Sequence, residues 1–180
     1  KRGWDIEGIE YSLDAVNFAK RNYGINLKPG DFLDIKLEKN KYDYVVINNV
    51  LEHLHKPLET LKKANQVLHE NGKLIVAVPN IDSLGFKIFT KNWYPLQPPI
   101  HLYHFSPETI GKMLKKAGFR LEKISHSYQV HSYFSFFESY RSLLTGRKKK
   151  KKLTTRGINN PKANKKKISL MRELAVLNGK

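Results

Sequence analysis

Strand-like hydrophobic patterns recur along the chain. Residues 42–48 and 73–80 are apolar through their middle, which is typical of parallel strands buried on both faces of a sheet. Weaker strand patterns occupy residues 4–10 and 25–32, and residues 119–127 alternate as an outer strand would. These segments are the predicted strands.

Helical periodicity fills the gaps between them. Residues 12–24, 57–72 and 106–119 repeat apolar side chains at helical spacing, and each begins with Ser or Pro, which favour a helix start. The aromatic-rich residues 133–146 are predicted to cover the sheet or an acceptor site, or to rest on an anionic membrane surface. Residues 168–179 are predicted to form a short amphipathic helix that docks back on the domain.

Strands that alternate with helices indicate an α/β fold with a parallel or mostly parallel sheet. Ligands of such folds lie beyond the carboxyl ends of the strands, where the strand order reverses. The residues that directly follow each predicted strand are therefore the candidate binding residues. They are Glu10 and Tyr11, Asp31 and Phe32, Asn48 and Asn49, and Pro79 and Asn80.

The chemistry of these residues suits a nucleoside. A carboxylate accepts two hydrogen bonds at once, so an acid directly after a strand suits the hydroxyls of a ribose. An Asp followed by an aromatic residue suits an adenine, because the carboxylate accepts from the amine while the ring packs on the base. Each residue taken singly is more often a helix cap or a turn residue. Together they indicate a nucleoside site.

Composition narrows the function classes. The chain has no cysteine, which excludes disulfides, thiolate metal sites and thiol nucleophiles. No apolar run approaches the roughly 20 residues that a membrane span needs. We expect a soluble, cytoplasmic protein, with the inner membrane surface as a peripheral alternative.

Positive charge is concentrated in the last 35 residues. Residues 146–180 hold 13 Lys or Arg against one acid, so this segment carries +12 of the net charge of +17. We therefore divide the chain into a domain at 1–145 and a Lys-rich basic segment at 146–180. The runs at 147–152 and 162–167 suit nucleic acid or an anionic membrane surface, although a solvated Lys-rich loop is the more ordinary interpretation.

Four motifs occur in order between residues 3 and 126. They read "GIEYS", "PGDFLD", "YDYVVINNVLEHLHKPLETLKKANQVLHENGKLIVAVPN" and "HLYHFSPETIGKMLKKAGF". This ordered set resembles the class I S-adenosylmethionine-dependent methyltransferases. The resemblance implies a Rossmann-like three-layer αβα fold and S-adenosyl-L-methionine as the cofactor.

The resemblance also assigns roles to individual residues. It implies that Glu10 holds the ribose hydroxyls and that Tyr11 flanks the adenine. It places Asp31 at the adenine amine with Phe32 beside the ring, and Ile47 and Asn48 along the methionine part. The acceptor itself attacks the methyl group in this family, so the site needs no protein nucleophile and acts mainly by positioning.

Two departures from the family pattern affect the expected fold. The first family strand, with its glycine-rich "GxGxG" turn, is absent, and the closing strand after an "LGxGD"-like turn is absent too. We therefore expect a fragment that lacks the first and the last strand. Such a fragment is expected to bind the cofactor poorly by itself.

Two His-containing segments are candidates for chemistry. Some relatives hold a divalent metal with an "E-x-x-E-H" motif, but Asn49 stands here in place of the first acid, so we expect Glu52 and His53 to bond within the fold and predict no metal. His101 suits a general base for a hydroxyl acceptor, beneath a lid formed by residues 92–99. The alternative is that His101 fixes the loop ahead of the Ser106 helix cap.

The sequence thus predicts methyl transfer to an oxygen of a small-molecule, lipid-linked or sugar-like acceptor. His101 and the absence of an amine-type "N/D-P-P-Y" motif favour oxygen. One alternative is an RNA or other nucleic-acid methyltransferase that uses the basic tail. The other is a noncatalytic module that keeps the fold without turnover.

Overall fold

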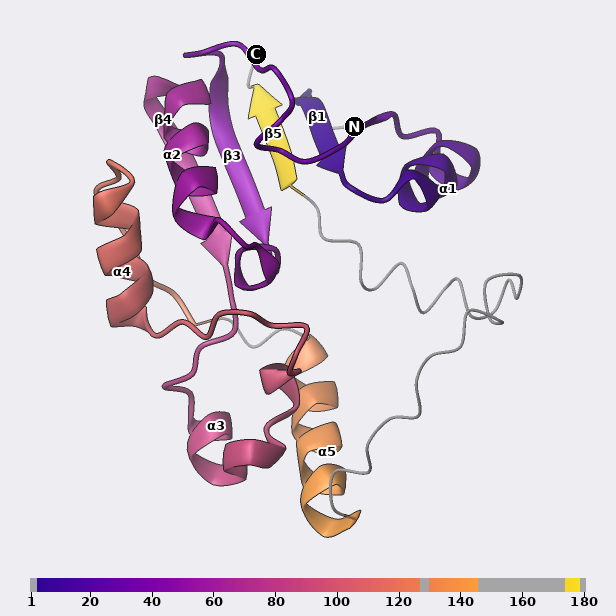
Figure 1. The fold of residues 1–180 in the computed structure, drawn as a ribbon, viewed down its shortest axis with the longest axis vertical. Coiled ribbons are helices and arrows are strands. Elements are labelled where there is room, and N and C mark those ends of the chain that lie inside the picture. Colours follow the sequence, from indigo (N-terminus) through magenta and orange to yellow (C-terminus); the bar gives the residue numbers. More distant parts are fainter. Residues whose placement is uncertain (1–2, 127–129, 146–173, 179–180) are drawn as a thin grey trace.

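The computed structural model describes residues 3–126, 130–145 and 174–178, so the basic runs at 147–152 and 162–167 lie outside the described residues. Five strands form one sheet in the order β2-β1-β5-β3-β4. Their bounds are β1 Asp5–Glu10, β2 Leu27–Pro29, β3 Tyr42–Asn48, β4 Leu68–Ala77 and β5 Leu174–Asn178. Figure 1 shows β5 between β1 and β3 near the middle of the sheet.

The first four strands all run in one direction. β1 is parallel to β2 and β3 is parallel to β4, while β5 is antiparallel to both β1 and β3. The predicted α/β fold with a mostly parallel sheet is confirmed. The carboxyl ends of β1, β2, β3 and β4 consequently meet at one edge of the sheet, with β1 and β3 separated by two strand spacings, or about 10 Å.

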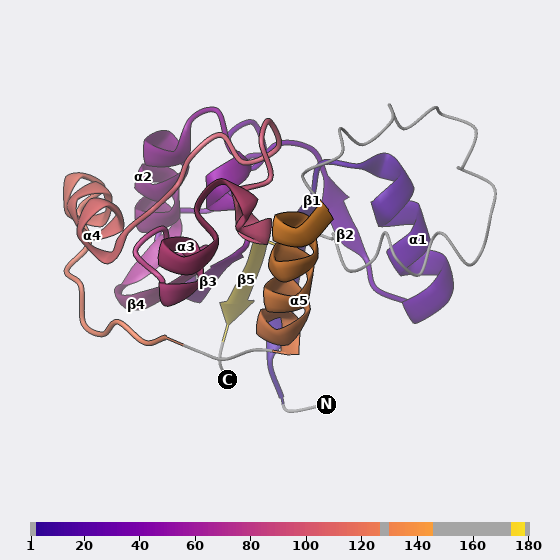
Figure 2. The ribbon, with the colours of Figure 1, turned by 90° about the horizontal axis from the view of Figure 1, so that it is seen from below.

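Helices connect the parallel strands. α1 (Leu13–Tyr23) joins β1 to β2, and α2 (Pro57–Val67) joins β3 to β4. α1 begins where the Ser12 hydroxyl accepts the Ala15 N–H, and ends at Gly24 in the left-handed conformation. After β4 come α3 (Leu84–Phe89), α4 (Pro107–Lys116) and α5 (Val130–Thr145). Figure 2 shows α2 and α4 on one side of the molecule and α1 on the other.

The core lies between the sheet and the helices α2 and α4. Val45 and Ile47 of β3 are fully buried against Leu61 and Ala64 of α2, as the continuous apolar run at 42–48 predicts. Tyr42 is buried at the start of β3, where its hydroxyl donates to Glu7 Oε2 at 3.1 Å. Burial raises the pKa of Tyr42 to about 12. This core supports the carboxyl ends of β3 and β4.

The structure corrects two predicted elements. The predicted outer strand at 119–127 is wrong for its described part, because residues 119–126 form no strand and leave Leu121 and Ile124 nearly half exposed. The predicted terminal helix is also wrong, because Leu174–Asn178 is β5. Its backbone bonds to β1 on one side and to β3 on the other, and these distant partners replace the local bonds that a helix would make.

The structure goes against one of the alternatives predicted for the aromatic segment, that it covers the sheet. α5 packs on α3 and on the turns at 90–96 instead of covering the sheet. Its aromatic side chains from Tyr133 to Tyr140 are 49–79% exposed. The aromatic rings of α5 therefore lie at the surface of the protein.

Candidate active site

Polar residues gather at the carboxyl edge of the parallel strands, as predicted. Glu10 ends β1, Asn48 ends β3, and Asp31 lies two residues beyond β2. Asn80 follows β4, where it pairs with Phe105 in an isolated parallel bridge. The fold thus places residues from four separate parts of the sequence along one edge of the sheet, where ligands of such folds bind.

Glu10 is partly exposed at the end of β1. Its Oε1 accepts the Ser12 N–H at 2.8 Å, and its backbone carbonyl accepts the Gly30 N–H at 3.0 Å. Gly30 has a φ of 131°, a conformation that glycine adopts without the strain of a side chain. A carboxylate accepts several hydrogen bonds, so Glu10 keeps capacity for ribose hydroxyls. Tyr11 is 79% exposed beside it, and its ring is open to stack on a base.

Asp31 organises the turn that follows β2. Its Oδ1 accepts the Leu33 N–H at 2.8 Å, and its carbonyl accepts from Asp34 and Ile35. Asp31 is therefore a turn residue, as its type allows, while its exposed carboxylate remains compatible with an adenine amine. Phe32 is only 6% exposed and packs into the core, so it supports the turn from below.

Lys63 of α2 holds this turn in place, a role that the sequence did not reveal. Its Nζ donates to the carbonyl oxygens of Leu33 at 2.8 Å and Ile35 at 2.6 Å. It also lies 5.3 Å from the centre of the Phe32 ring, within cation–π range. Desolvation by burial lowers the pKa of Lys63. In the sequence Lys63 looks like either of the two lysines on the helix, Lys62 and Lys63.

The end of β3 presents one buried and one exposed side chain to the edge. Ile47 is fully buried in the core, whereas Asn48 is exposed and its Oδ1 accepts the Asn49 Nδ2 at 3.1 Å. Asn49 has a φ of 51°, a conformation that Asn tolerates better than most residues, and its N–H bonds to Ala77 at the end of β4. The chain therefore turns sharply here, and the Asn48 amide stays at the surface of the edge.

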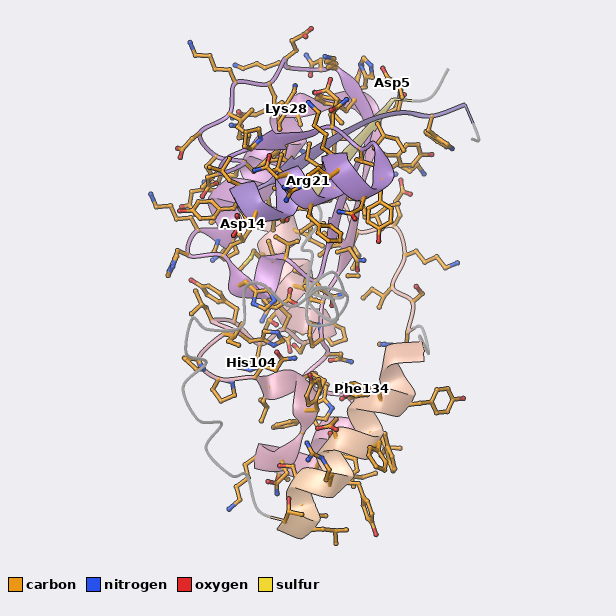
Figure 3. All side chains as sticks on the ribbon, turned by 90° about the vertical axis from the view of Figure 1, so that its right-hand side faces the viewer. Asp5, Asp14, Arg21, Lys28, His104 and Phe134 are labelled. Atoms are coloured by element: carbon orange, nitrogen blue, oxygen red, sulfur yellow. The ribbon has the colours of Figure 1, made fainter. Side chains whose placement is uncertain are left out.

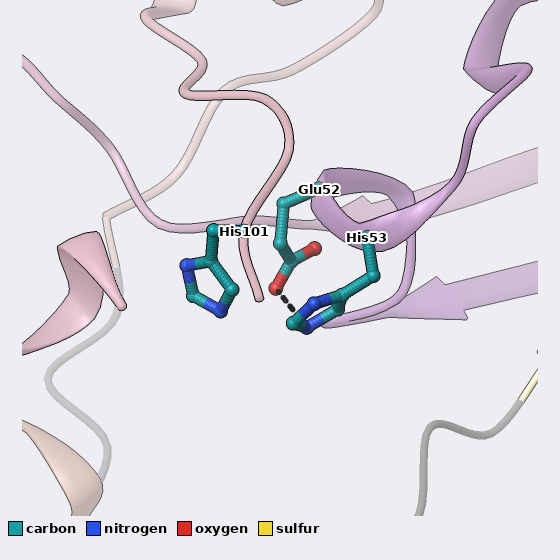
Figure 4. Close-up of side chains that lie close together, drawn as sticks. All are labelled: Glu52, His53 and His101. Carbon is teal, nitrogen blue, oxygen red and sulfur yellow. Dashed lines mark ion pairs between the residues drawn. The ribbon is translucent and has the colours of Figure 1, made fainter. Parts of the chain in front are cut away.

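Three ionisable side chains converge just beyond β3. Glu52 and His53 lie in the 3-10 helix η1 (Leu51–His53), and His101 comes from a loop nearly fifty residues away in the sequence. Figure 4 shows the two imidazole rings on either side of the Glu52 carboxylate. Glu52 Oε1 lies 3.5 Å from His53 Nε2, and the His53 and His101 rings meet edge to face with centres 4.4 Å apart. Each of the three side chains is more than nine-tenths buried.

Backbone contacts fix the loop that carries His101. The Glu52 carbonyl accepts the N–H groups of Leu102 and Tyr103, at 2.8 and 3.1 Å. The Ile100 carbonyl accepts from His53 Nδ1 at 3.0 Å, which places the proton on Nδ1 and directs Nε2 toward Glu52. These contacts confirm that Glu52 and His53 bond within the fold.

This cluster is chemically suited to handle a proton. A carboxylate, an imidazole of fixed orientation and a second imidazole resemble the relay arrangements that accept and store a proton during catalysis. The same three residues each offer one ligand atom, all within 4.8 Å of one another, and two His with one carboxylate is a donor set that also binds divalent metals. The sequence did not predict that His101 lies beside Glu52 and His53. The backbone bonds that place its loop join residues about fifty positions apart in the chain.

Comparison with known proteins agrees with this fold. A family model described as a methyltransferase domain matches residues 1–124, about two thirds of the chain. The chain belongs to the class I S-adenosylmethionine-dependent methyltransferases. The predicted family, its Rossmann-like fold and S-adenosylmethionine as its cofactor are thus confirmed.

Individual relatives share only part of their length with the chain. An uncharacterized protein of Methanocaldococcus jannaschii is 25% identical over 114 residues, which cover 63% of this chain and 55% of that protein. The demethylmenaquinone methyltransferase of Staphylococcus saprophyticus is 31% identical over 75 residues, covering 39% of this chain and 32% of that enzyme. The chain thus spans little more than half the length of the first relative and a third of the second.

The fold is similar to a solved methyltransferase structure. The S-adenosylmethionine-dependent methyltransferase of Thermotoga maritima superposes with a TM-score of 0.55 and 24% sequence identity, covering 63% of this chain and 54% of that one. In such a fold the cofactor lies along the carboxyl edge of the parallel strands, which is where Glu10, Asp31 and Asn48 are found. No helix among the described residues is both long and apolar enough to cross a membrane.

Proposed function

We propose that the protein transfers the methyl group of S-adenosylmethionine to an oxygen atom of a small-molecule, lipid-linked or sugar-like acceptor. The observation that carries this proposal is the buried cluster of Glu52, His53 and His101 beside the carboxyl end of β3. An oxygen acceptor must lose its proton as it gains a methyl group, and this cluster offers a place for that proton. The cofactor, when bound, supplies a methyl group on a positively charged sulfur.

The chain's own residues would hold the cofactor along the edge. Glu10 would accept hydrogen bonds from both ribose hydroxyls, since its carboxylate has capacity beyond the bond from Ser12. Tyr11 would stack on the adenine, and Asp31 would accept from the adenine amine while Lys63 keeps its turn closed. Ile47 and Asn48 would border the methionine part from the end of β3.

His101 is the proposed proton acceptor. Its ring lies against His53, and the carboxylate of Glu52 lies close to both rings, where it can balance a positive imidazolium. Residues Glu52 and His53 would then act as positioning residues for His101. The expected catalytic gain from one placed general base is about 100-fold or more.

One observation favours an oxygen acceptor over an amine, and a second favours a lipid-like acceptor. The chain contains no "N/D-P-P-Y" motif of the kind that holds amines in this superfamily. The Staphylococcus relative, by its name, acts on demethylmenaquinone, a precedent for a lipid-like acceptor in a protein that shares part of this chain.

Calorimetric titration of the whole protein that carries this chain, with S-adenosylhomocysteine, tests the cofactor half of the proposal. We expect binding in the micromolar range, and we expect Glu10→Ala to weaken it about tenfold or more, since a charged hydrogen-bond partner is worth about 1.5–3 kcal/mol. Asp14→Ala, on the exposed start of α1, is the matched control and should leave binding unchanged. Absence of binding would remove the cofactor and the enzyme assignment together.

The nature of the acceptor atom is tested with S-adenosylmethionine that carries a ¹³C-labelled methyl group. The protein is incubated separately with a lipid extract, a water-soluble extract and total RNA, and the labelled products are examined by NMR. A methyl carbon bonded to oxygen in a lipid or small-molecule product would support the proposal. A methyl carbon on nitrogen or carbon, or label only in RNA, would contradict it.

A further inference from the structure

Helix α5 faces the protein with its polar side. Among its residues with described side chains, the only ones that are not exposed are Ser135, Glu138, Ser139 and Ser142. The apolar residues of the same stretch point outward: Tyr133, Phe134, Phe136, Phe137, Tyr140, Leu143 and Leu144 are all 49–79% exposed. This is the reverse of an ordinary surface helix, which buries its apolar stripe against the core.

Hydrogen bonds hold α5 in this orientation. The fully buried Ser139 Oγ accepts the Tyr94 N–H at 2.8 Å and donates to the Ser135 carbonyl at 2.6 Å. Ser142 Oγ bonds to Asn92 Oδ1 at 3.3 Å. The polar face is thus bonded to the turns at 90–96. A rotation that buried the aromatic face would break these bonds, so the outward direction of the rings is built into the packing.

The outward residues form a continuous band. Tyr133, Phe137, Tyr140 and Leu144 follow one another at steps of four, three and four residues, so they share one line along the helix. Phe136 and Leu143 widen the band on one side, where Phe136 also meets Phe89 edge to face at 5.0 Å between ring centres. Figure 3 shows Phe134 on α5, well away from Asp5 and Lys28 on the sheet. Figure 1 shows α5 on the side of the molecule toward which the arrowheads of β3 and β4 point.

Strong positive charge follows this band directly in the sequence. Arg147 and five consecutive lysines at 148–152 begin two residues after the end of α5 at Thr145. An exposed band of Phe, Tyr and Leu beside a cluster of Lys and Arg is the composition of a helix that rests in a membrane interface. Anionic headgroups attract such lysines with about 1 kcal/mol each, while the rings enter the boundary between headgroups and acyl chains.

We propose that the aromatic band of α5 docks the protein on an anionic membrane surface, with its rings directed into the bilayer interface. The lysines that follow α5 in the sequence are the reason to expect an anionic surface and not a neutral one. Nucleic acid fits this surface less well. Phosphates would engage the lysines and bases would stack on the rings, but Leu143 and Leu144 would stay in water. The inference does not depend on methyl transfer, because it concerns binding alone.

Vesicle co-sedimentation of the full chain tests the proposal. The probes are vesicles of phosphatidylcholine alone and of phosphatidylcholine with about one third phosphatidylserine, at low and at high salt. We expect at least tenfold tighter partition onto the anionic vesicles at low salt. The triple variant Phe137→Gln, Tyr140→Gln, Leu144→Gln should lose at least tenfold of that partition, and Lys148–Lys151→Gln should lose a similar factor on anionic vesicles only.

Matched controls separate docking by this surface from nonspecific hydrophobic binding and from misfolding. Leu13→Gln, Tyr23→Gln and Ile25→Gln remove equally exposed apolar side chains near α1 and should change partition less than twofold. Circular dichroism of each variant should match the unchanged chain, and the substituted side chains at residues 13, 23, 25, 137, 140 and 144 are all exposed. A fluorescent label on α5 should shift toward the blue on anionic vesicles, which marks entry of the helix into the interface.

Four results would overturn the proposal. They are absence of vesicle binding, equal binding to neutral and anionic vesicles, unchanged binding by the triple variant, and dimers that disappear in the triple variant without any vesicle binding. The last result would identify a second copy of the chain as the occupant of the band. Tight, salt-dependent binding of single-stranded RNA without vesicle binding would likewise assign the basic run to nucleic acid.

Discussion

Lys63→Met removes the ammonium group that closes the turn after β2 while it keeps an apolar stem of similar length. In the unchanged chain, Lys63 Nζ donates to two backbone carbonyls at 2.8 and 2.6 Å and lies over the Phe32 ring. The turn that it closes carries Asp31, the predicted partner of the adenine amine. The substitution therefore tests a structural contact and a site position at the same time.

The size of the effect follows from the contacts. Hydrogen bonds from a charged donor contribute about 1.5–3 kcal/mol each, and a partly buried carbonyl can recover some of this from water. The desolvation that lowers the pKa of Lys63 also reduces the net gain. We take the lower end for both bonds and expect Lys63→Met to cost about 2–3 kcal/mol of unfolding free energy.

Urea unfolding followed by circular dichroism measures this cost, and hydrogen exchange of residues 31–36 locates it. Lys62→Met is the matched control, because Lys62 is the preceding residue on α2 and is exposed. We expect the control to differ from the unchanged chain by less than about 0.5 kcal/mol. Equal stabilities of the two variants, or unchanged exchange at 31–36, would refute the role assigned to Lys63.

Three further predictions concern the cluster of Glu52, His53 and His101 and the Glu7 carboxylate of β1. His101→Ala should depress methyl transfer about 100-fold while cofactor affinity changes little; the opposite pattern would make His101 a purely structural residue. Hydrogen bonding from Lys28 lowers the pKa of Glu7 below its ordinary 4.5, so Glu7 stabilises the fold above that pH and loses this contribution as the pH falls. In acid titrations followed by circular dichroism, Glu7→Gln should therefore show a shallower loss of stability than the unchanged chain. We still predict no metal at Glu52, His53 and His101. A chelator should therefore leave the melting temperature unchanged, and added Zn²⁺ or Mn²⁺ should not raise it. A rise in melting temperature that Glu52→Gln abolishes would assign a metal to the cluster.

The sequence determined the elements whose signals are local. The apolar runs located β3 and most of β4, the Ser and Pro starts located the helices α1, α2 and α4, and Glu10, Asp31 and Asn48 followed from the rule that polar residues after parallel strands face a ligand. The strand and helix predictions succeeded because strand burial and helix capping are encoded within a few neighbouring residues. The binding roles of Glu10, Asp31 and Asn48 stay a prediction.

The tertiary structure alone decided three features. The segment at 174–178 became a strand because two distant strands offered it backbone partners on both sides. His101 joined Glu52 and His53 because backbone N–H groups after it bond to the Glu52 carbonyl, a contact that spans some fifty residues. α5 turned its rings outward because buried serines found hydrogen-bond partners in the turns at 90–96. Each outcome depends on which distant groups satisfy a backbone or hydroxyl hydrogen bond, and residue spacing along one segment does not contain that information.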